Sequence, residues 1–171
     1  DSLLSVERFL PVRQNYELIL RQALEANGDY AVTILDCPPA LGVTTRCALA
    51  ASNILIIPTQ CEYFSAYALR QVVRLIRNVR QRSNPALRYR LLLTMLDRRN
   101  SLHRSLAEQI RRAFGPAVFT TEIEIDARLR EAPAFGQPIT IYAPTSRGAL
   151  QYRALASELR EHAQETVASA A

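Results

Sequence analysis

Hydrophobic residues along this chain follow two patterns, and their order predicts an alternation of helices and strands. Leucine and isoleucine between positions 18 and 24 recur at helical spacing, which predicts a helix of about four turns ending at Asn27-Gly28. Residues 30–36 form a short apolar run rich in β-branched side chains, and Pro38-Pro39 stops it. This run predicts a buried strand that carries the Asp36 carboxylate at its C-terminal end.

The middle of the chain repeats the pattern of an apolar run followed by proline. Residues 43–51 predict a short helix, and residues 53–58 predict a second strand. Residues 65–81 have apolar side chains at three- and four-residue steps, which predicts an amphipathic helix. Its other side carries Arg70, Arg74 and Arg77.

A third strand is predicted at residues 89–96, followed by a helix capped by Ser101 and ended by Gly115-Pro116. We expect the apolar side chains of this helix to point inward. They are Leu102, Leu106, Ile110 and Phe114.

The last part of the chain predicts shorter elements. Residues 118–123 alternate weakly and indicate a fourth strand, residues 128–132 indicate a helical turn, and residues 138–142 indicate a short edge strand. Thr145 or Ser146 is expected to cap a final amphipathic helix. Its apolar positions are Leu150, Leu155, Ala156 and Leu159.

Strand, helix and strand with continuous apolar runs are typical of a parallel sheet covered on both faces. The predicted fold is therefore α/β, with three layers, a mostly parallel sheet and helices on both faces. Residues 1–171 contain no repeat, low-complexity block or linker, so we expect a single domain. No apolar run approaches the roughly 18 residues of a membrane span, and a cytoplasmic protein is expected.

Charge is distributed unevenly along the chain, whose formal net charge is +5. Residues 70–112 hold twelve arginines against Asp97 and Glu108, a net of +10, so the remainder is acidic at −5. There is no lysine anywhere in the sequence. This separation indicates a polyanionic partner more strongly than the overall balance does.

Asp36 is the residue with the clearest chemical meaning. A carboxylate at the C-terminal end of an apolar strand lies where open α/β sheets bind ligands. In nucleotide hydrolases such an acid helps to hold Mg²⁺. The alternative is a carboxylate that only caps the following turn.

Four segments resemble the ParA/Soj family of chromosome and plasmid partitioning ATPases in order and spacing. They are Asp36-Cys-Pro-Pro-Ala-Leu-Gly42, Pro58-Thr-Gln-Cys-Glu-Tyr63, Leu92-Leu-Thr-Met-Leu-Asp97 and Arg128-Leu-Arg-Glu-Ala-Pro-Ala-Phe-Gly136. The resemblance runs from about Gly28 to the last helix. It implies a deviant Walker-type P-loop ATPase fold, of which this chain is the C-terminal portion.

The resemblance also implies an ATP and Mg²⁺ site. Asp36 would be the Walker B acid, holding Mg²⁺ through water and serving catalysis, with Pro38, Pro39 and Gly42 shaping the loop beside the γ-phosphate. Thr94, Met95 and Asp126 would hold adenine, although Glu124, Ile125 and Asp126 stand where relatives usually have a proline, a basic residue and an asparagine. The alternative for Met95 and Asp126 is core packing and a helix cap.

Family members begin with a glycine-rich phosphate loop that carries two lysines. A chain with five scattered glycines and no lysine cannot build such a loop. We therefore expect that the N-terminal third with the P-loop is missing from this sequence. The 171 residues alone are expected to hydrolyse no ATP.

The resemblance implies a homodimer that binds double-stranded DNA non-specifically when ATP is bound, at the nucleoid, with hydrolysis stimulated by a ParB-type partner. Arg99 and Arg128 match the family's DNA-binding arginines. Additional candidates from charge alone are Arg98, Arg104, Arg111 and Arg112. Binding to phosphates without base contacts is expected to weaken as salt rises.

Two other interpretations remain open. One is a MinD-like ATPase tethered to a membrane, but residues 158–171 have mixed charges and few bulky apolar side chains, so no membrane partner is expected. The other is a non-catalytic DNA-binding or dimerising remnant of the same fold. The missing phosphate loop favours the remnant, and the retained Asp36 with its Pro-Pro turn opposes it.

Overall fold

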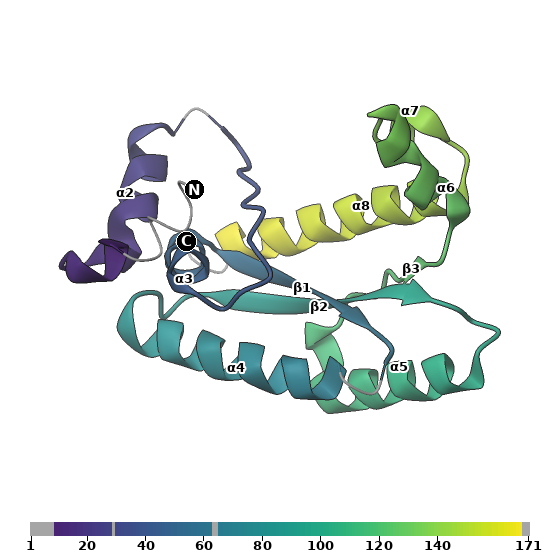
Figure 1. The fold of residues 1–171 in the computed structure, drawn as a ribbon, viewed down its shortest axis with the longest axis horizontal. Coiled ribbons are helices and arrows are strands. Elements are labelled where there is room, and N and C mark those ends of the chain that lie inside the picture. The colour runs from purple at the N-terminus through teal and green to yellow at the C-terminus, as the bar shows by residue number, and fades with distance from the viewer. Residues whose placement is uncertain (1–8, 29, 63–64, 169–171) are drawn as a thin grey trace. The chain divides into compact units, whose positions relative to one another are not determined.

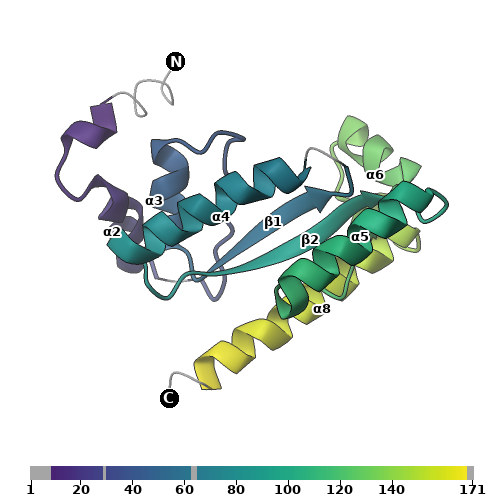
Figure 2. The ribbon, with the colours of Figure 1, turned by 90° about the horizontal axis from the view of Figure 1, so that it is seen from below.

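The computed structural model describes residues 9–28, 30–62 and 65–168. In these ranges the chain forms an α/β fold with one three-stranded sheet in the order β1-β2-β3, and the predicted parallel arrangement is confirmed (Figure 2). The strands are β1 (Ile54–Gln60), β2 (Arg88–Leu96) and β3 (Ile123–Glu124). β2 pairs with β3 in parallel, and a parallel bridge joins Leu91 to Val118.

The described residues fall into two compact units. Unit 1 is drawn from Asp1–Leu55 and Tyr67–Tyr89, and unit 2 from Ile56–Ala66 and Arg90–Ala171. The prediction of a single domain stays a prediction. No helix in the described ranges is both long and apolar enough to cross a membrane.

Unit 1 consists mainly of helices, and side chains of neighbouring segments donate to backbone carbonyls of α3 and of the residue after it. The helices are η1 (Leu10–Val12), η2 (Tyr16–Leu18), α2 (Ile19–Ala26), α3 (Val43–Ala51) and α4 (Ser65–Arg82), which enters the unit at Tyr67. The Arg21 guanidinium of α2 donates to the carbonyl of Ala50 in α3. The buried Asn84 side chain donates to the carbonyls of Leu49 and Ser52, at 2.9 and 2.7 Å. Asn84 therefore ties the end of α4 to the end of α3.

Unit 2 holds its core between the strands and the last helix. Its helices are α5 (Ser101–Phe114), η3 (Gly115–Ala117), α6 (Ala127–Glu131), η4 (Ala132–Phe135), α7 (Ile139–Tyr142) and α8 (Arg147–Ala168). Helices α5 and α8 cover opposite sides of the strands (Figure 1). Leu92, Phe119, Ile123 and Leu155 form a buried cluster.

The strand predicted at residues 30–36 is not present. This segment has no regular structure, and Tyr30, Val32 and Ile34 are 79%, 77% and 89% exposed. A strand requires a neighbour that accepts and donates its backbone hydrogen bonds. None of the strands in the described sheet pairs with this segment, so Asp36 ends an exposed segment instead of a buried strand.

Two other elements differ from the prediction. Residues 139–142 form a short helix instead of an edge strand, because the Pro138 carbonyl accepts from the backbone N–H of both Ile141 and Tyr142. The first helix, Ile19–Ala26, has eight residues and is shorter than the predicted four turns, since the residues before it form a 3₁₀ helix. β1 also continues through Pro58 to Gln60.

The helix boundaries near positions 101 and 147 are close to the prediction. Asn100, not Ser101, caps α5 by accepting from the Leu102 N–H at 2.9 Å, while the Ser146 hydroxyl accepts from the Ala149 N–H as expected. Leu102 is 57% exposed, so the prediction that it points inward is wrong, and Leu150, an apolar position of the last helix, is 56% exposed. Leu102 is the second residue of α5, at the capped end of the helix.

Candidate functional site

The loop that the sequence assigned to the phosphates lies in unit 1, directly before α3. Asp36 is exposed, and in the described part of the chain its carboxylate has no hydrogen-bond or ion-pair partner. Gly42 is the N-cap residue of α3, and its carbonyl accepts from the Arg46 N–H at 3.2 Å. The Thr45 hydroxyl donates to the Ala40 carbonyl at 2.6 Å. The loop is therefore fixed to the first turn of α3, and the Asp36 oxygens remain available to a hard cation.

The end of β2 in unit 2 contains an irregularity at Met95. Met95 has φ +53°, and the pairing register between β2 and β3 shifts between Thr94 and Leu96. The bulge leaves Met95 42% exposed, and the Gln60 side-chain amide at the end of β1 lies 3.4 Å from its sulfur. The ends of parallel strands are where α/β sheets bind ligands. Gln60 was not among the predicted site residues, although it belongs to the second family-like segment.

The positive φ at Met95 makes its backbone sensitive to the side chain. Met95→Val is expected to lower the free energy of unfolding by about 1–2 kcal/mol relative to Met95→Gly, because a β-branched residue is strained in the left-handed region. Urea unfolding followed by circular dichroism measures the difference. Equal stability of the two variants would show that this backbone is not left-handed in solution.

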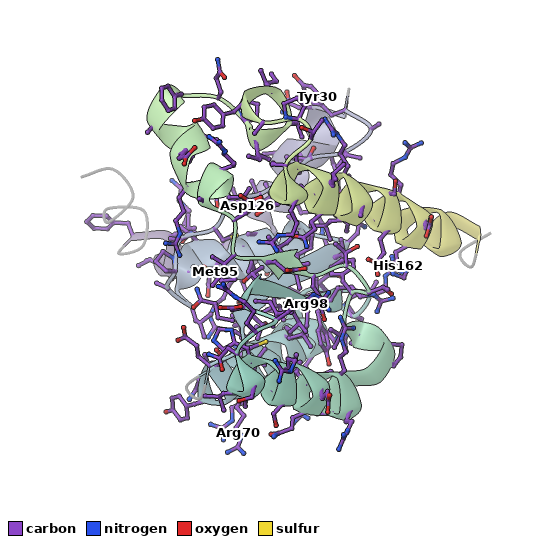
Figure 3. All side chains as sticks on the ribbon, turned by 90° about the vertical axis from the view of Figure 1, so that its right-hand side faces the viewer. Tyr30, Arg70, Met95, Arg98, Asp126 and His162 are labelled. Atoms are coloured by element: carbon purple, nitrogen blue, oxygen red, sulfur yellow. The ribbon has the colours of Figure 1, made fainter. Side chains whose placement is uncertain are left out.

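Asp126 acts as a double backbone cap in unit 2. One carboxylate oxygen accepts from the Arg128 N–H at 2.9 Å, which starts α6, and the other accepts from the Gly148 N–H at 2.8 Å, in the first turn of α8. A Cβ on Gly148 would lie 2.7 Å from Cγ of Leu129, so α8 begins in close contact with α6. Asp126 lies beside the end of β3 (Figure 3). Its predicted contact with adenine stays a prediction, and the carboxylate already has two partners.

The hydrogen bond from the Gly148 N–H, then that from the Arg128 N–H, holds the pKa of Asp126 below its usual value against the effect of burial. A carboxyl whose pKa is lowered by folding contributes stability above its unfolded pKa of about 3.9 and loses it as pH falls through the lower folded pKa. Asp126→Asn removes the charge and keeps one of the two acceptors, because the amide oxygen can accept from one N–H while the NH₂ group cannot accept from the other. We expect wild type to be more stable than Asp126→Asn above about pH 5 and this advantage to shrink as pH falls below about 4. A stability difference that does not change with pH would contradict this assignment.

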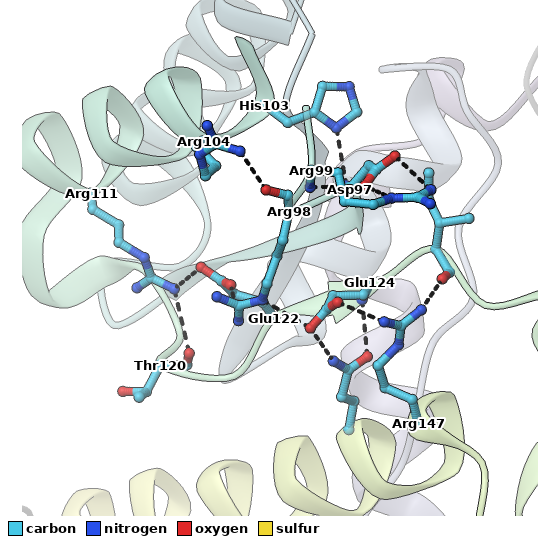
Figure 4. Close-up of polar contacts among 12 residues, drawn as sticks. Asp97, Arg98, Arg99, His103, Arg104, Arg111, Thr120, Glu122, Glu124 and Arg147 are labelled. Atoms are coloured by element: carbon cyan, nitrogen blue, oxygen red, sulfur yellow. Dashed lines mark hydrogen bonds and ion pairs between the residues drawn. The ribbon is translucent and has the colours of Figure 1, made fainter. Parts of the chain in front are cut away.

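Two glutamates hold three arginines in an ion-pair network (Figure 4). Arg98 pairs with Glu122 at 2.8 Å and with Glu124 at 2.9 Å. Arg111 pairs with Glu122 at 2.8 Å, and Arg147 pairs with Glu124 at 2.9 Å. The Glu122 and Glu124 side chains are only 13% and 12% exposed, so the network holds the segment before α6 against α5 and α8.

The six predicted DNA-binding arginines differ in how far other groups of the chain already engage their side chains. Arg98 and Arg111 are engaged by carboxylates that lie outside the basic stretch and that the charge count overlooked. Arg104 is exposed and donates to the Arg98 carbonyl at 2.6 Å. The side chains of Arg99, Arg112 and Arg128 are 92%, 80% and 59% exposed, each with one exposed ion pair. These pairs are Arg99–Asp97, Arg112–Glu108 and Arg128–Glu131.

Comparison with known proteins places these features in a family. A family model described as an AAA domain matches residues 1–89. The chromosome partitioning protein ParA of Caulobacter vibrioides is 40% identical over 163 residues, which cover 93% of this chain and 60% of that protein. The sporulation initiation inhibitor protein Soj of Bacillus subtilis is 43% identical over 145 residues, 84% of this chain and 57% of that protein.

A solved structure of similar fold carries a nucleotide. The cobyrinic acid a,c-diamide synthase of Mycobacterium smegmatis, crystallised with bound ADP and magnesium, is 30% identical with a TM-score of 0.78. The match covers 95% of this chain and 60% of that protein. The chain thus spans less than two thirds of the length of these three proteins. It belongs to the ParA/Soj family of partitioning ATPases.

Proposed function

We propose that this chain is part of a ParA-type ATPase that partitions DNA. The observation that carries the proposal is 40% identity to the chromosome partitioning protein ParA of Caulobacter vibrioides over 93% of the chain. In this proposal an ATP-bound homodimer binds double-stranded DNA at the nucleoid in the cytoplasm, and a ParB-type partner protein stimulates hydrolysis. Binding to the phosphate backbone needs no base contact and therefore has no sequence preference.

The exposure of two arginines supports the DNA-binding part of the proposal. Arg99 lies in the turn between β2 and α5, and Arg128 lies in the first turn of α6. Their ion pairs with Asp97 and Glu131 lie in solvent, where such pairs are weak and exchange readily. A phosphate oxygen can replace either carboxylate without leaving a buried charge.

The residues present fit part of an ATP and Mg²⁺ site. The unpartnered Asp36 carboxylate is a suitable oxygen ligand for Mg²⁺, directly or through water. These residues do not form a phosphate-binding loop, because the five glycines are spread over the chain and there is no lysine to contact the phosphates. Gly42 begins α3, while Gly115 and Gly136 end helical segments with φ +51° and +64°.

In this proposal the exposed arginines already give a single 171-residue chain a weak affinity for duplex DNA, and the ATP-bound dimer of the whole protein adds avidity. DNA binding of the 171-residue chain therefore tests the proposal. Fluorescence anisotropy with two 30-bp duplexes of unrelated sequence should give the same affinity for both. The logarithm of the affinity should fall linearly with the logarithm of the salt concentration, by roughly 0.9 for each phosphate contacted. Strong preference for one duplex, or an affinity independent of salt, would overturn the proposal.

A further inference from the structure

Helix α4 carries a row of arginines that the predicted DNA-binding set does not include. Arg70, Arg74 and Arg77 are exposed, and in the described part of the chain no hydrogen bond or ion pair engages any of them. We call these three residues the α4 arginine row. Figure 3 shows the Arg70 side chain pointing away from the ribbon.

The packing of α4 fixes the direction of the row. The opposite face of the helix buries Leu69, Leu75, Ile76 and Val79, which are 5%, 6%, 1% and 1% exposed. At the C-terminal end, Arg80 turns inward and its Nε donates to the Leu87 carbonyl at 2.7 Å. The helix therefore cannot rotate without exposing its core face, and the row stays on the surface.

The charge of α4 is not balanced within the helix. Its sequence SAYALRQVVRLIRNVRQR contains five arginines and no acidic residue. Like charges at three- and four-residue spacing destabilise a helix. A helix surface that only has to be soluble usually carries charges of both signs. Arg46 of α3 brings another cation to α4, because its guanidinium donates to the Asn78 side chain, next to Arg77 in the sequence, at 3.1 Å.

Spacing and chemistry of the row match a phosphate backbone. Arg70 and Arg77 are separated by seven residues, a rise of about 10 Å along the helix. Over that length each DNA strand presents about three phosphates. Guanidinium groups bind phosphate oxygens through two parallel hydrogen bonds, which a row of lysines would not do.

We propose that the α4 arginine row is a further surface of this chain for the backbone of duplex DNA, in addition to Arg99 and Arg128. This inference rests on the proposed function, since it assumes that the chain binds DNA. It assigns part of the affinity to α4, which neither the family-like segments nor the predicted residues include. The row contributes charge and phosphate contacts and no base recognition.

The test compares wild type with Arg70→Gln/Arg74→Gln/Arg77→Gln in anisotropy titrations on a 30-bp duplex from low to moderate salt. The variant is expected to bind about 10- to 100-fold more weakly at low salt, with a salt slope smaller by about 2.7, because three phosphate contacts are lost. Glutamine and arginine both favour helices, so circular dichroism should be unchanged. The matched variant with three lysines should keep most of the slope and lose part of the affinity.

The outcomes separate this inference from the proposed function. If wild type binds no DNA, the proposed function fails and the inference with it. If wild type binds but the triple-glutamine variant has the same affinity and slope, only the α4 surface is refuted. A second measurement tests adsorption of both proteins to vesicles of phosphatidylserine and phosphatidylcholine. If the triple-glutamine variant keeps DNA binding but no longer adsorbs to these vesicles, the row binds lipid headgroups and the inference is likewise refuted.

Discussion

Replacing Arg99 and Arg128 together by glutamate is expected to lower the affinity of this chain for duplex DNA on the order of 100-fold and to reduce the salt slope by about 2. Both side chains are largely exposed, and each has a single ion pair in solvent. Glutamate at these positions would repel phosphates and would stand beside Asp97 and Glu131. Anisotropy titrations on one duplex at several salt concentrations measure both quantities.

A charge-matched control separates local contact from overall charge. Arg13→Glu with Arg160→Glu changes the net charge by the same amount at exposed positions outside the predicted set. This control should lose only a small part of the affinity, because neither arginine belongs to the predicted DNA-binding set and the effect of overall charge is screened by salt. If the Arg99/Arg128 variant binds as tightly as the control, the two arginines do not contact DNA.

Arg98 and Arg111 are expected to behave differently from Arg99. Their guanidinium groups compensate Glu122 and Glu124, whose carboxylates are mostly buried. Removing Arg98 would leave Glu122 with Arg111 alone and Glu124 with Arg147 alone, and removing Arg111 would leave Glu122 with Arg98 alone. Weaker compensation of a mostly buried charge destabilises the fold. An Arg98 or Arg111 variant is therefore expected to be less stable. If it also binds DNA more weakly, its unfolding free energy has to be measured before the weaker binding is attributed to a lost arginine–phosphate contact.

The sequence predicted the elements whose pattern is long and locally determined. The helix at Ser65–Arg82, the helix at Ser101–Phe114 and the strand at Arg88–Leu96 were predicted within one residue at each end. Each has either many turns of helical periodicity or a continuous apolar run. In such segments the burial pattern alone selects the secondary structure.

The prediction failed where structure depends on a partner or on a few local hydrogen bonds. The apolar run at residues 30–36 has strand composition, yet a strand also needs a neighbour, which composition cannot supply. Residues 139–142 are too few for a period of two to be distinguished from a helical turn, and hydrogen bonds to the Pro138 carbonyl decide the outcome. At the site, counting charges found the basic stretch but not the pairing of Arg98 with Glu122 and Glu124.

Phe119→Ala is expected to be the most destabilising of the substitutions considered, with a loss of about 3–5 kcal/mol of unfolding free energy. Phe119 is fully buried at 0% exposure and packs with Leu92, Ile123 and Leu155. Its backbone N–H also donates to the Leu91 carbonyl at 2.9 Å, so the ring is held at the sheet edge. Alanine would leave a cavity that this backbone cannot close. Urea unfolding followed by circular dichroism gives the loss.

Phe135→Ala is the matched control, since it makes the same chemical change at a surface position. Phe135 is 65% exposed and stacks on Tyr142 with ring centroids 5.2 Å apart, a contact worth about 1 kcal/mol. Equal losses in the two variants would contradict the placement of the unit 2 core. Because Ile123 packs on Phe119 and lies between Glu122 and Glu124, the buried ring also supports the network that holds Arg98. The Phe119 variant should therefore lose the low-salt DNA affinity that depends on an ordered unit 2, while the Phe135 variant should retain it.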